Sequence, residues 1–466
     1  MHDLLIKGGT VATASDVFKA DVAVTNGVIT AIGNDLGAAQ TVLDASGKLV
    51  LPGGVDTHCH IEQLSGAGLM NADTFETATR SAAFGGTTTT VSFAAQHPGM
   101  RLSQVMADYM TLADKGALID HAYHAIIADT SGANLTDDLP QLIGAGHRSL
   151  KVFTTYDKVR LNDAEILQTL MVAKAHGALV CFHAENDAMI RWATQTLLAD
   201  GKTAPKYHAQ SHPRAAEIEA LGRICQFAEV TRQPVMLFHI STSEGVEIVR
   251  AAKARGAPVW AETCPHYLFM TEDILDQPGH AGAAYLCSPP QRQTADQDAL
   301  WAGLADGTLS LITSDHAPYR MDETGKFAHG TDAPFPKMAN GMPGLEPRLP
   351  LLFDAMVSKG RMDLRAFVRL TATAPAELFG LTGKGRIAQG ADADIAIWDP
   401  DAQLTYGAND LHCNTGYNPF AGATVKGLPQ TVLSRGQAIV TDRKLTGKPG
   451  QGRRVPMQFS AAMAAG

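Results

Sequence analysis

Short apolar segments alternate with helical segments along the middle of the chain, and this alternation constrains the fold most strongly. Helical stretches such as 163–176 and 245–255 lie between most of the apolar segments. Strands separated by helices are typical of βα units, whose strands join one parallel sheet. Eight such strands predict an α/β chain folded as a (β/α)8 barrel of the TIM type. The predicted strands are 55–60, 87–94, 121–127, 150–155, 179–183, 235–240, 259–263 and 309–314.

The two ends of the chain are rich in β-strand signals instead. Residues 20–24 and 28–32 are strand-like with a hairpin signal between them, and strand-like segments return at 393–398 and 430–433. We therefore predict a small β-sandwich domain that both termini build together. A Gly-rich arm at the end of the chain can lie on a neighbouring subunit. The predicted boundaries are 1–52 and 380–440 for the sandwich, 53–379 for the barrel and 441–466 for the arm.

His58 and His60 lie at the end of the first predicted barrel strand, in the run Val-Asp-Thr-His-Cys-His. Side chains two residues apart on a strand point the same way, so both imidazoles face one point. Neutral imidazole is a strong ligand for zinc and similar metals. The pair alone is a modest signal, because His-x-His in a strand is often ordinary polar surface.

Polar residues also occupy the ends of other predicted strands, where the chemistry of such barrels takes place. Each has a simpler explanation when taken singly, since Lys151 can be a snorkelling lysine and Asp315 can cap a helix. Their matching positions instead favour a catalytic metal centre with an open face for water. One zinc ion needs fewer ligands, so the set predicts two divalent ions that share a ligand. The candidate ligands are His58, His60, Lys151, His183, His239 and Asp315.

Charge and composition exclude other classes of partner. The net charge is −9 and the pI about 6.0, with no strong basic patch, so we expect no nucleic-acid partner. No apolar run reaches the ~20 residues that cross a bilayer, and no leader is visible. The six cysteines are widely spaced, as in a reducing compartment. We therefore expect a cytoplasmic protein with no membrane partner.

Taken together, the motifs resemble the amidohydrolase superfamily, and within it the hydantoinases and dihydropyrimidinases, over essentially the whole chain. The resemblance implies the (β/α)8 barrel with its β-sandwich, an enzyme of the cyclic amidase type, and a homotetramer or dimer. The motifs that carry it are PGGVDTHCH at 52–60, SLKVF at 149–153, HAEN at 183–186, SPP at 288–290, TSDHAP at 313–318 and NGMPGLE at 340–346.

The resemblance also implies a role for each matching residue. Lys151 would be carboxylated, and its carbamate would bridge two divalent ions, with zinc as the expected metal. His58, His60 and Asp315 would complete one ion's ligands, and His183 and His239 the other's. Asp315 would also take the proton of the attacking water and deliver it to the leaving nitrogen. Tyr156 would stabilise the oxyanion, and the main chain of Ser288 and Asn340 would bind the ring amide.

The segment after His60 bears on the substrate. Relatives that open a carboxylate-bearing ring carry an arginine shortly after the His-x-His, and this chain has none there. His266, in a Cys-Pro-His-Tyr run, is instead a feature of allantoinases. The loop 62–73 is rich in Gly, Leu and Met, and its Leu64, together with Phe153 and Val159, is predicted to line an apolar pocket. The same side chains could equally be lid residues that pack on one another.

These observations predict hydrolysis of the ring amide of hydantoins, 5-substituted and D-selective, or of dihydropyrimidines, giving N-carbamoyl amino acids. The substrate would be a small cyclic amide. Two alternatives remain open at this point: an allantoinase or other cyclic ureide hydrolase, and a non-catalytic assembly protein related to dihydropyrimidinase. The second alternative is disfavoured because such proteins lack metal ligands, whereas all six positions are kept here.

Overall fold

Eight parallel strands form a curled sheet in the computed structural model of the protein, each strand pairing with the next in chain order. The structure describes residues 1–66 and 68–464. Ala67 of the loop 62–73 and the last two residues of the predicted arm lie outside the described residues. The predicted barrel is confirmed. Its strands are β8 (Gly54–Cys59), β9 (Thr87–Ala95), β10 (Asp120–Ile126), β11 (Ser149–Phe153), β12 (Leu179–His183), β13 (Val235–Leu237), β14 (Val259–Thr263) and β15 (Leu311–Ile312).

The first and last strands meet along a seam that closes the barrel. Cys59 and His316 form a parallel bridge, and the His60 N–H donates to the His316 carbonyl over 2.6 Å. Arg348 is fully buried beneath this seam, where it pairs with Asp56 at 3.2 Å and donates to the carbonyl of Ile312. A buried cation therefore joins the two strands whose ladder is shortest.

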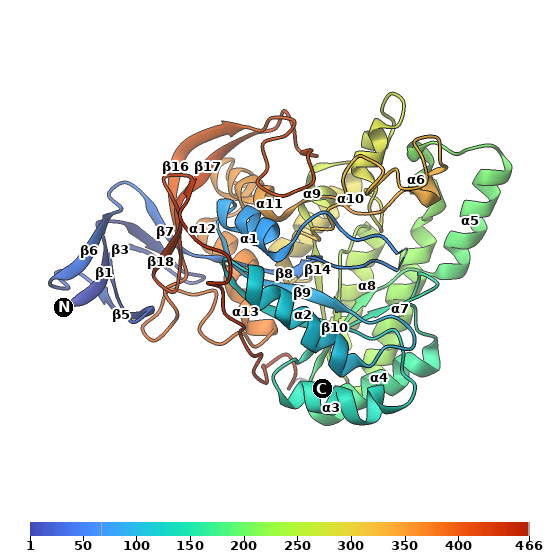
Figure 1. The fold of residues 1–466 in the computed structure, drawn as a ribbon, viewed down its shortest axis with the longest axis horizontal. Helices are drawn as coiled ribbons and strands as arrows, with labels where there is room; N and C mark the ends of the chain where they lie inside the picture. The colour runs from blue at the N-terminus through green and yellow to red at the C-terminus, as the bar shows by residue number, and fades with distance from the viewer. Residues whose placement is uncertain (67, 465–466) are drawn as a thin grey trace.

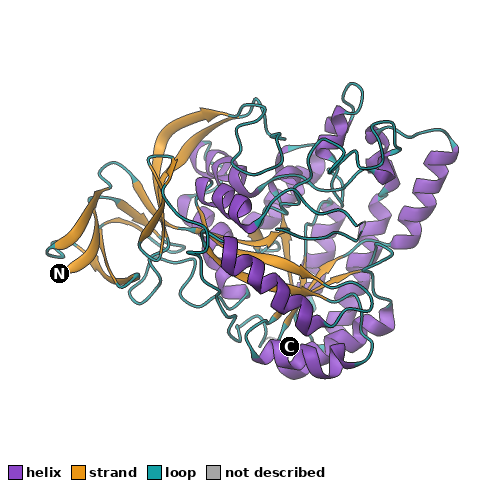
Figure 2. Ribbon diagram, viewed as in Figure 1, coloured by secondary structure: helices purple, strands orange, loops and turns teal. Residues whose placement is uncertain are grey.

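Helices follow the strands and surround the barrel, as Figure 2 shows in purple. Their boundaries agree with local signals: Asn162 caps the helix predicted at 163–176, and Thr242 caps a helix that begins two residues before the predicted 245. The helices are α1 (Phe75–Phe84), α2 (Leu102–Gly116), α3 (Leu139–Gly144), α4 (Asp163–His176), α5 (Asp187–Ala199), α6 (His208–Ser211), α7 (Arg214–Thr231), α8 (Ser243–Ala254), α9 (Pro265–Phe269), α10 (Thr294–Ala305), α11 (Leu345–Phe353), α12 (Leu364–Val368) and α13 (Ala374–Leu378).

Two barrel strands are at least three residues shorter than the sequence predicts. β13 ends at Leu237 rather than 240, and β15 spans only two residues of the predicted 309–314. In both places a residue with positive φ follows, His239 at 43° and Asp315 at 45°. This left-handed conformation cannot continue a strand, so the chain leaves the ladder where these side chains turn into the barrel mouth.

Two further sheets lie beside the barrel, at the left of Figure 1. Residues from both ends of the chain build the larger sheet, because β7 pairs antiparallel with β16, whereas the smaller sheet comes from the N-terminal end alone. The prediction for β16 was too short, since it runs on to Thr405. One sheet has the order β5-β4-β1-β6: β5 (Val28–Gly33), β4 (Asp21–Thr25), β1 (His2–Lys7) and β6 (Ala39–Asp44). The other has the order β19-β18-β17-β16-β7-β2-β3: β19 (Lys444–Leu445), β18 (Gln437–Thr441), β17 (Thr424–Ser434), β16 (Ile395–Thr405), β7 (Leu49–Pro52), β2 (Thr10–Ala12) and β3 (Val17–Lys19).

The end of the chain lies against its own barrel. β19 continues the sheet to Leu445, and the irregular arm follows. The Val455 N–H donates to the His121 carbonyl over 2.8 Å, and Met457 donates to Gly146 over 2.9 Å. The arm therefore contacts the start of β10 and the turn after α3 within one subunit. Among the described helices, none is long and apolar enough to cross a membrane.

Candidate active site

The six candidate metal ligands come together at the carboxyl ends of the barrel strands. All of them line one cavity of about 660 Å³. His58 Nε2 lies 3.0 Å from Asp315 Oδ1, and His60 Nε2 lies 3.5 Å from the same atom. The ring centroids of His183 and His239 are 4.5 Å apart, and those of His239 and His58 are 5.5 Å apart. Residues distant in sequence thus face one small volume.

This donor set fits divalent metal ions. Ligand atoms of His58, His60 and Asp315 lie within 4.8 Å of one another. His239 Nδ1 is buried and has no hydrogen-bond partner among the described residues, as expected of an atom that a bound ion would satisfy. Imidazole nitrogens with a carboxylate are the ligands of catalytic zinc sites, and such sites keep a position open for water.

Neighbouring side chains orient three of the histidines. His58 Nδ1 lies 2.5 Å from Glu262 Oε1, His60 Nδ1 lies 2.6 Å from Gln63 Oε1, and His183 Nε2 lies 2.8 Å from Glu185 Oε2. Such contacts fix the tautomer and leave the second ring nitrogen free for a metal. Sequence reasoning missed Glu262 and Gln63. An acidic residue inside the apolar strand 259–263 was the available signal for Glu262.

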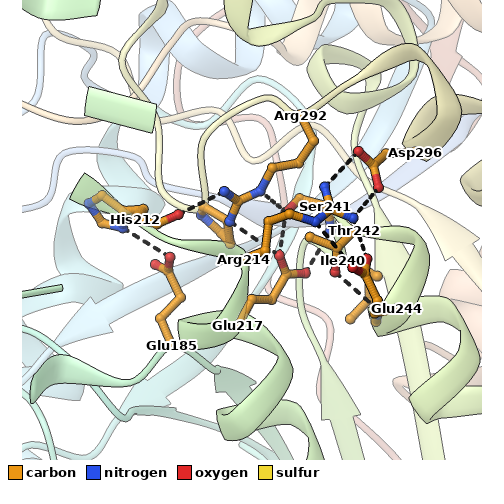
Figure 3. Close-up of polar contacts among 12 residues, drawn as sticks. Glu185, His212, Arg214, Glu217, Ile240, Ser241, Thr242, Glu244, Arg292 and Asp296 are labelled. Carbon is orange, nitrogen blue, oxygen red and sulfur yellow. Dashed lines mark hydrogen bonds and ion pairs between the residues drawn. The ribbon is translucent and has the colours of Figure 1, made fainter. Parts of the chain in front are cut away.

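A buried polar network, drawn in Figure 3, lies next to the candidate ligands His183 and His239 in the chain and in space. Glu185 also binds His212 Nδ1 at 2.9 Å, and Arg292 donates to the His212 carbonyl over 2.7 Å. Arg292 Nε donates to Ser241 Oγ over 3.1 Å, and the Ser241 N–H donates to Glu217 over 2.9 Å. Ser241 lies two residues after His239. Arg292 therefore links the segment that carries His239 to Glu185 and His212, which lie beside His183.

Lys151 is buried among aromatic rings in the same cavity. Its Nζ lies 4.1 Å from the ring centroid of Phe238 and 4.9 Å from that of Phe153. Burial lowers the pKa of Lys151 to about 8, although Asp315 acts in the opposite direction. The amine is therefore neutral in a larger fraction of molecules than an exposed lysine would be at the same pH.

The other predicted site residues also line the cavity. Tyr156 follows β11 with a φ of 73°, and its ring centroid lies 5.2 Å from that of His183. Burial raises the pKa of Tyr156 above its usual range, so its hydroxyl remains a proton donor. The Asn340 amide donates to Ser288 Oγ over 3.2 Å on the same cavity wall. Sequence and structure thus agree on which residues share this space.

The cavity also has apolar side chains in its lining. Leu64, Phe153 and Val159 line it, and Leu64 keeps 40% of its surface exposed. Because Leu64 lines the cavity and is this exposed, its side chain can contact a bound molecule. His266, the allantoinase-like residue, is buried and is not among the residues that line the cavity.

The family model for the amidohydrolase family matches residues 49–439. A D-hydantoinase of Ralstonia pickettii is 40% identical over 453 residues, which cover 97% of this chain and 98% of that protein. A D-phenylhydantoinase of Escherichia coli is 38% identical over 455 residues, 97% of each chain. The crystal structure of dihydropyrimidinase from Brevibacillus agri superimposes with a TM-score of 0.94 at 39% identity, covering 98% of this chain and 99% of that one.

Proposed function

The chain belongs to the amidohydrolase family, in its hydantoinase branch, and we propose that it hydrolyses the ring amide of 5-substituted hydantoins and of dihydropyrimidines. The products are N-carbamoyl amino acids, and the preferred hydantoin enantiomer is D. One observation carries this proposal: the four candidate histidine ligands, Lys151, Asp315 and Tyr156 line a single cavity together with apolar side chains.

The site residues divide the work of ring opening. The six candidate ligands, with Lys151 carboxylated, would hold two divalent ions, for which we propose zinc, and these ions would supply a water acidic enough to attack at neutral pH. Asp315 accepts the proton of that water as the new C–O bond forms, and delivers it to the ring nitrogen as the C–N bond breaks. The Tyr156 hydroxyl donates a hydrogen bond to the carbonyl oxygen as negative charge develops on it.

The apolar side chains in the cavity lining favour a substrate with an uncharged ring and an apolar substituent. In the segment after His60, Gln63 binds His60 Nδ1 at 2.6 Å, so this side chain supports a histidine rather than a substrate carboxylate. We propose that Leu64 and Phe153 contact the substituent at carbon 5 of the ring. Apolar contacts of this kind discriminate weakly, by ~1–3 kcal/mol per methylene.

Initial rates on three substrates test the proposal. Purified protein with its metal content measured should open 5-phenylhydantoin and dihydrouracil, releasing the N-carbamoyl acid, and should open D-phenylhydantoin faster than its L enantiomer. Opening of allantoin but of neither other ring would contradict the substrate assignment and favour an allantoinase. Absence of bound metal together with absence of all three activities would favour the assembly protein.

We also propose a homotetramer located in the cytoplasm, on the basis of the hydantoinase resemblance and the widely spaced free cysteines. Light scattering after size exclusion should give about four times the 49.3 kDa of one chain. A monomeric mass, or recovery in a membrane or secreted fraction, would contradict this part of the proposal.

A further inference from the structure

Lys326 is a fully buried lysine behind the wall of the cavity, in the long segment between β15 and α11. Its Nζ donates to the carbonyls of Ala339 over 2.8 Å and Gly341 over 2.6 Å, and contacts the carbonyl of Leu286 at 3.4 Å. An ammonium carries three protons, and three carbonyls accept them. Among the described residues, no carboxylate pairs with Lys326, so main-chain carbonyls are the hydrogen-bond partners of its amine.

The three carbonyls belong to two segments that form one wall of the cavity. Leu286 lies two residues before Ser288, while Ala339 and Gly341 flank Asn340. The Gly341 N–H also donates to the Leu286 carbonyl over 2.8 Å. Gly341 has a φ of 135°, and a Cβ there would lie 2.3 Å from the Ala317 carbonyl. The second segment is therefore packed against the rim of the eighth strand and cannot shift away from Lys326 on that side.

The opposite face of this wall is open to a ligand. Within the described residues, no hydrogen bond uses the main-chain N–H or C=O of Ser288 or Asn340. Main-chain groups of this kind require a ligand or water as a partner. Both residues line the cavity, whereas Lys326 does not. The carbonyls of the neighbouring residues are held by Lys326, and those of Ser288 and Asn340 remain available.

We infer that Lys326 is a positioning residue for substrate recognition: it fixes two main-chain segments at the separation that a planar –CO–NH– ring edge requires. This inference rests on the proposed function, because that edge belongs to the ring that is opened. Contacts to a ring edge are made in the ground state and in the transition state alike. Their loss therefore raises KM more than it lowers kcat.

Steady-state kinetics of Lys326→Met test the inference, since methionine replaces the four-carbon stem of the side chain with a stem of equal length and removes the amine with all three donors. We expect the KM for 5-phenylhydantoin to rise roughly tenfold or more, with kcat within about threefold of wild type. Metal content should remain at the wild-type value, because Lys326 contacts none of the candidate ligands. Lys337→Met, at an exposed lysine in the same segment, is the matched control and should leave both constants unchanged.

Lys326→Gln covers the case in which the methionine variant folds poorly, because its amide donates two hydrogen bonds and should give an intermediate KM. A KM within twofold of wild type in a folded variant overturns the inference. So does a fall in kcat equal to the fall in kcat/KM, or a loss of metal. A wild-type protein that opens no ring contradicts the proposed function instead. Equilibrium dialysis of 5-phenylhydantoin then tests Lys326, with the same tenfold weakening expected.

Discussion

Three residues that line the cavity adopt positive φ angles although none is glycine: Tyr156 at 73°, His239 at 43° and Asp315 at 45°. Such conformations are uncommon for residues with a Cβ and cost of order 1–3 kcal/mol each. All three follow barrel strands directly, at the points where the chain turns into the mouth. The fold thus keeps locally unfavourable conformations at the positions that aim these side chains into the cavity.

Lys151→Ala should remove bound metal and activity together, because the proposed shared ligand of the two ions is lost. Lys174→Ala, on an exposed position of α4, is the control and should retain both. Metal analysis by mass spectrometry, alongside hydantoin hydrolysis, measures the effect. Full activity in Lys151→Ala would rule out a bridging role.

Asp315→Asn should reduce kcat by roughly 10²–10⁴, the contribution of a positioned general base. Asparagine keeps the size of the side chain but cannot accept the proton. Within the described part of the chain, the ion-pair contacts of the Asp315 side chain are those with His58 and His60. Thermal unfolding should therefore change little. A collapse of the melting temperature with no specific loss of kcat would identify Asp315 as a structural residue.

At the scale of elements, Asp296 connects the starts of α7, α8 and α10. It binds Arg214 (Figure 3). It also accepts hydrogen bonds from the main-chain N–H groups of Ser243 and Gln293, at 2.8 and 3.0 Å. Burial alone would raise the pKa of Asp296, but these hydrogen bonds outweigh it and hold the pKa at about 2. A carboxyl with a depressed pKa stabilises the fold above its unfolded pKa near 4 and loses this contribution as the pH falls toward 2.

Asp296→Asn should therefore lower the free energy of unfolding by about 2 kcal/mol at pH 7 and by less at pH 3. Urea unfolding at several pH values between 7 and 3 measures the difference. Asp200→Asn, at a carboxylate that is 56% exposed beside Lys202, is the control and should track wild type. A difference that stays constant across this range would contradict the assigned role.

The elements also show how far sequence reasoning reaches. Apolar runs bounded by helices predicted all eight barrel strands, because burial on both faces leaves a clear hydrophobic signal. The ends of β13 and β15 were not predictable, since the left-handed turns at His239 and Asp315 depend on what surrounds them. Candidate ligands were found from their positions at strand ends. Gln63 was missed because a glutamine in a loop does not by itself predict a contact with His60, three residues before it. Lys326 was missed because its carbonyl partners lie 13 to 40 residues away in sequence.

At the scale of the whole molecule, Lys384 joins the barrel to the terminal sheets. Its Nζ lies 2.5 Å from Asp120 of β10 and 2.8 Å from both Asp392 and Asp394, just before β16. Arg435 also pairs with Asp120. The three carboxylates lie close enough to hold a metal ion, yet the lysine ammonium already occupies their centre. This buried ion-pair group, called the ionic joint below, therefore connects the barrel strand β10 to the segment just before β16.

Lys384→Met should destabilise the protein by about 3–5 kcal/mol, because it leaves buried carboxylates without their cation. Lys48→Met, which breaks a half-exposed pair with Asp399, should cost about 1 kcal/mol or less. Thermal and urea unfolding compare the two variants. Equal effects would show that the joint contributes no more than a surface pair.

The pairing of β7 with β16 has a consequence for synthesis. β7 is complete at residue 52, but its antiparallel partner is made roughly 340 residues later. At translation rates of about 5–20 residues per second, the apolar edge formed by Leu49, Val50 and Leu51 stays open for roughly 17–70 seconds on the ribosome. Exposed strand edges recruit other chains, so the nascent protein depends on protection during that interval, and truncated products retain the open edge permanently.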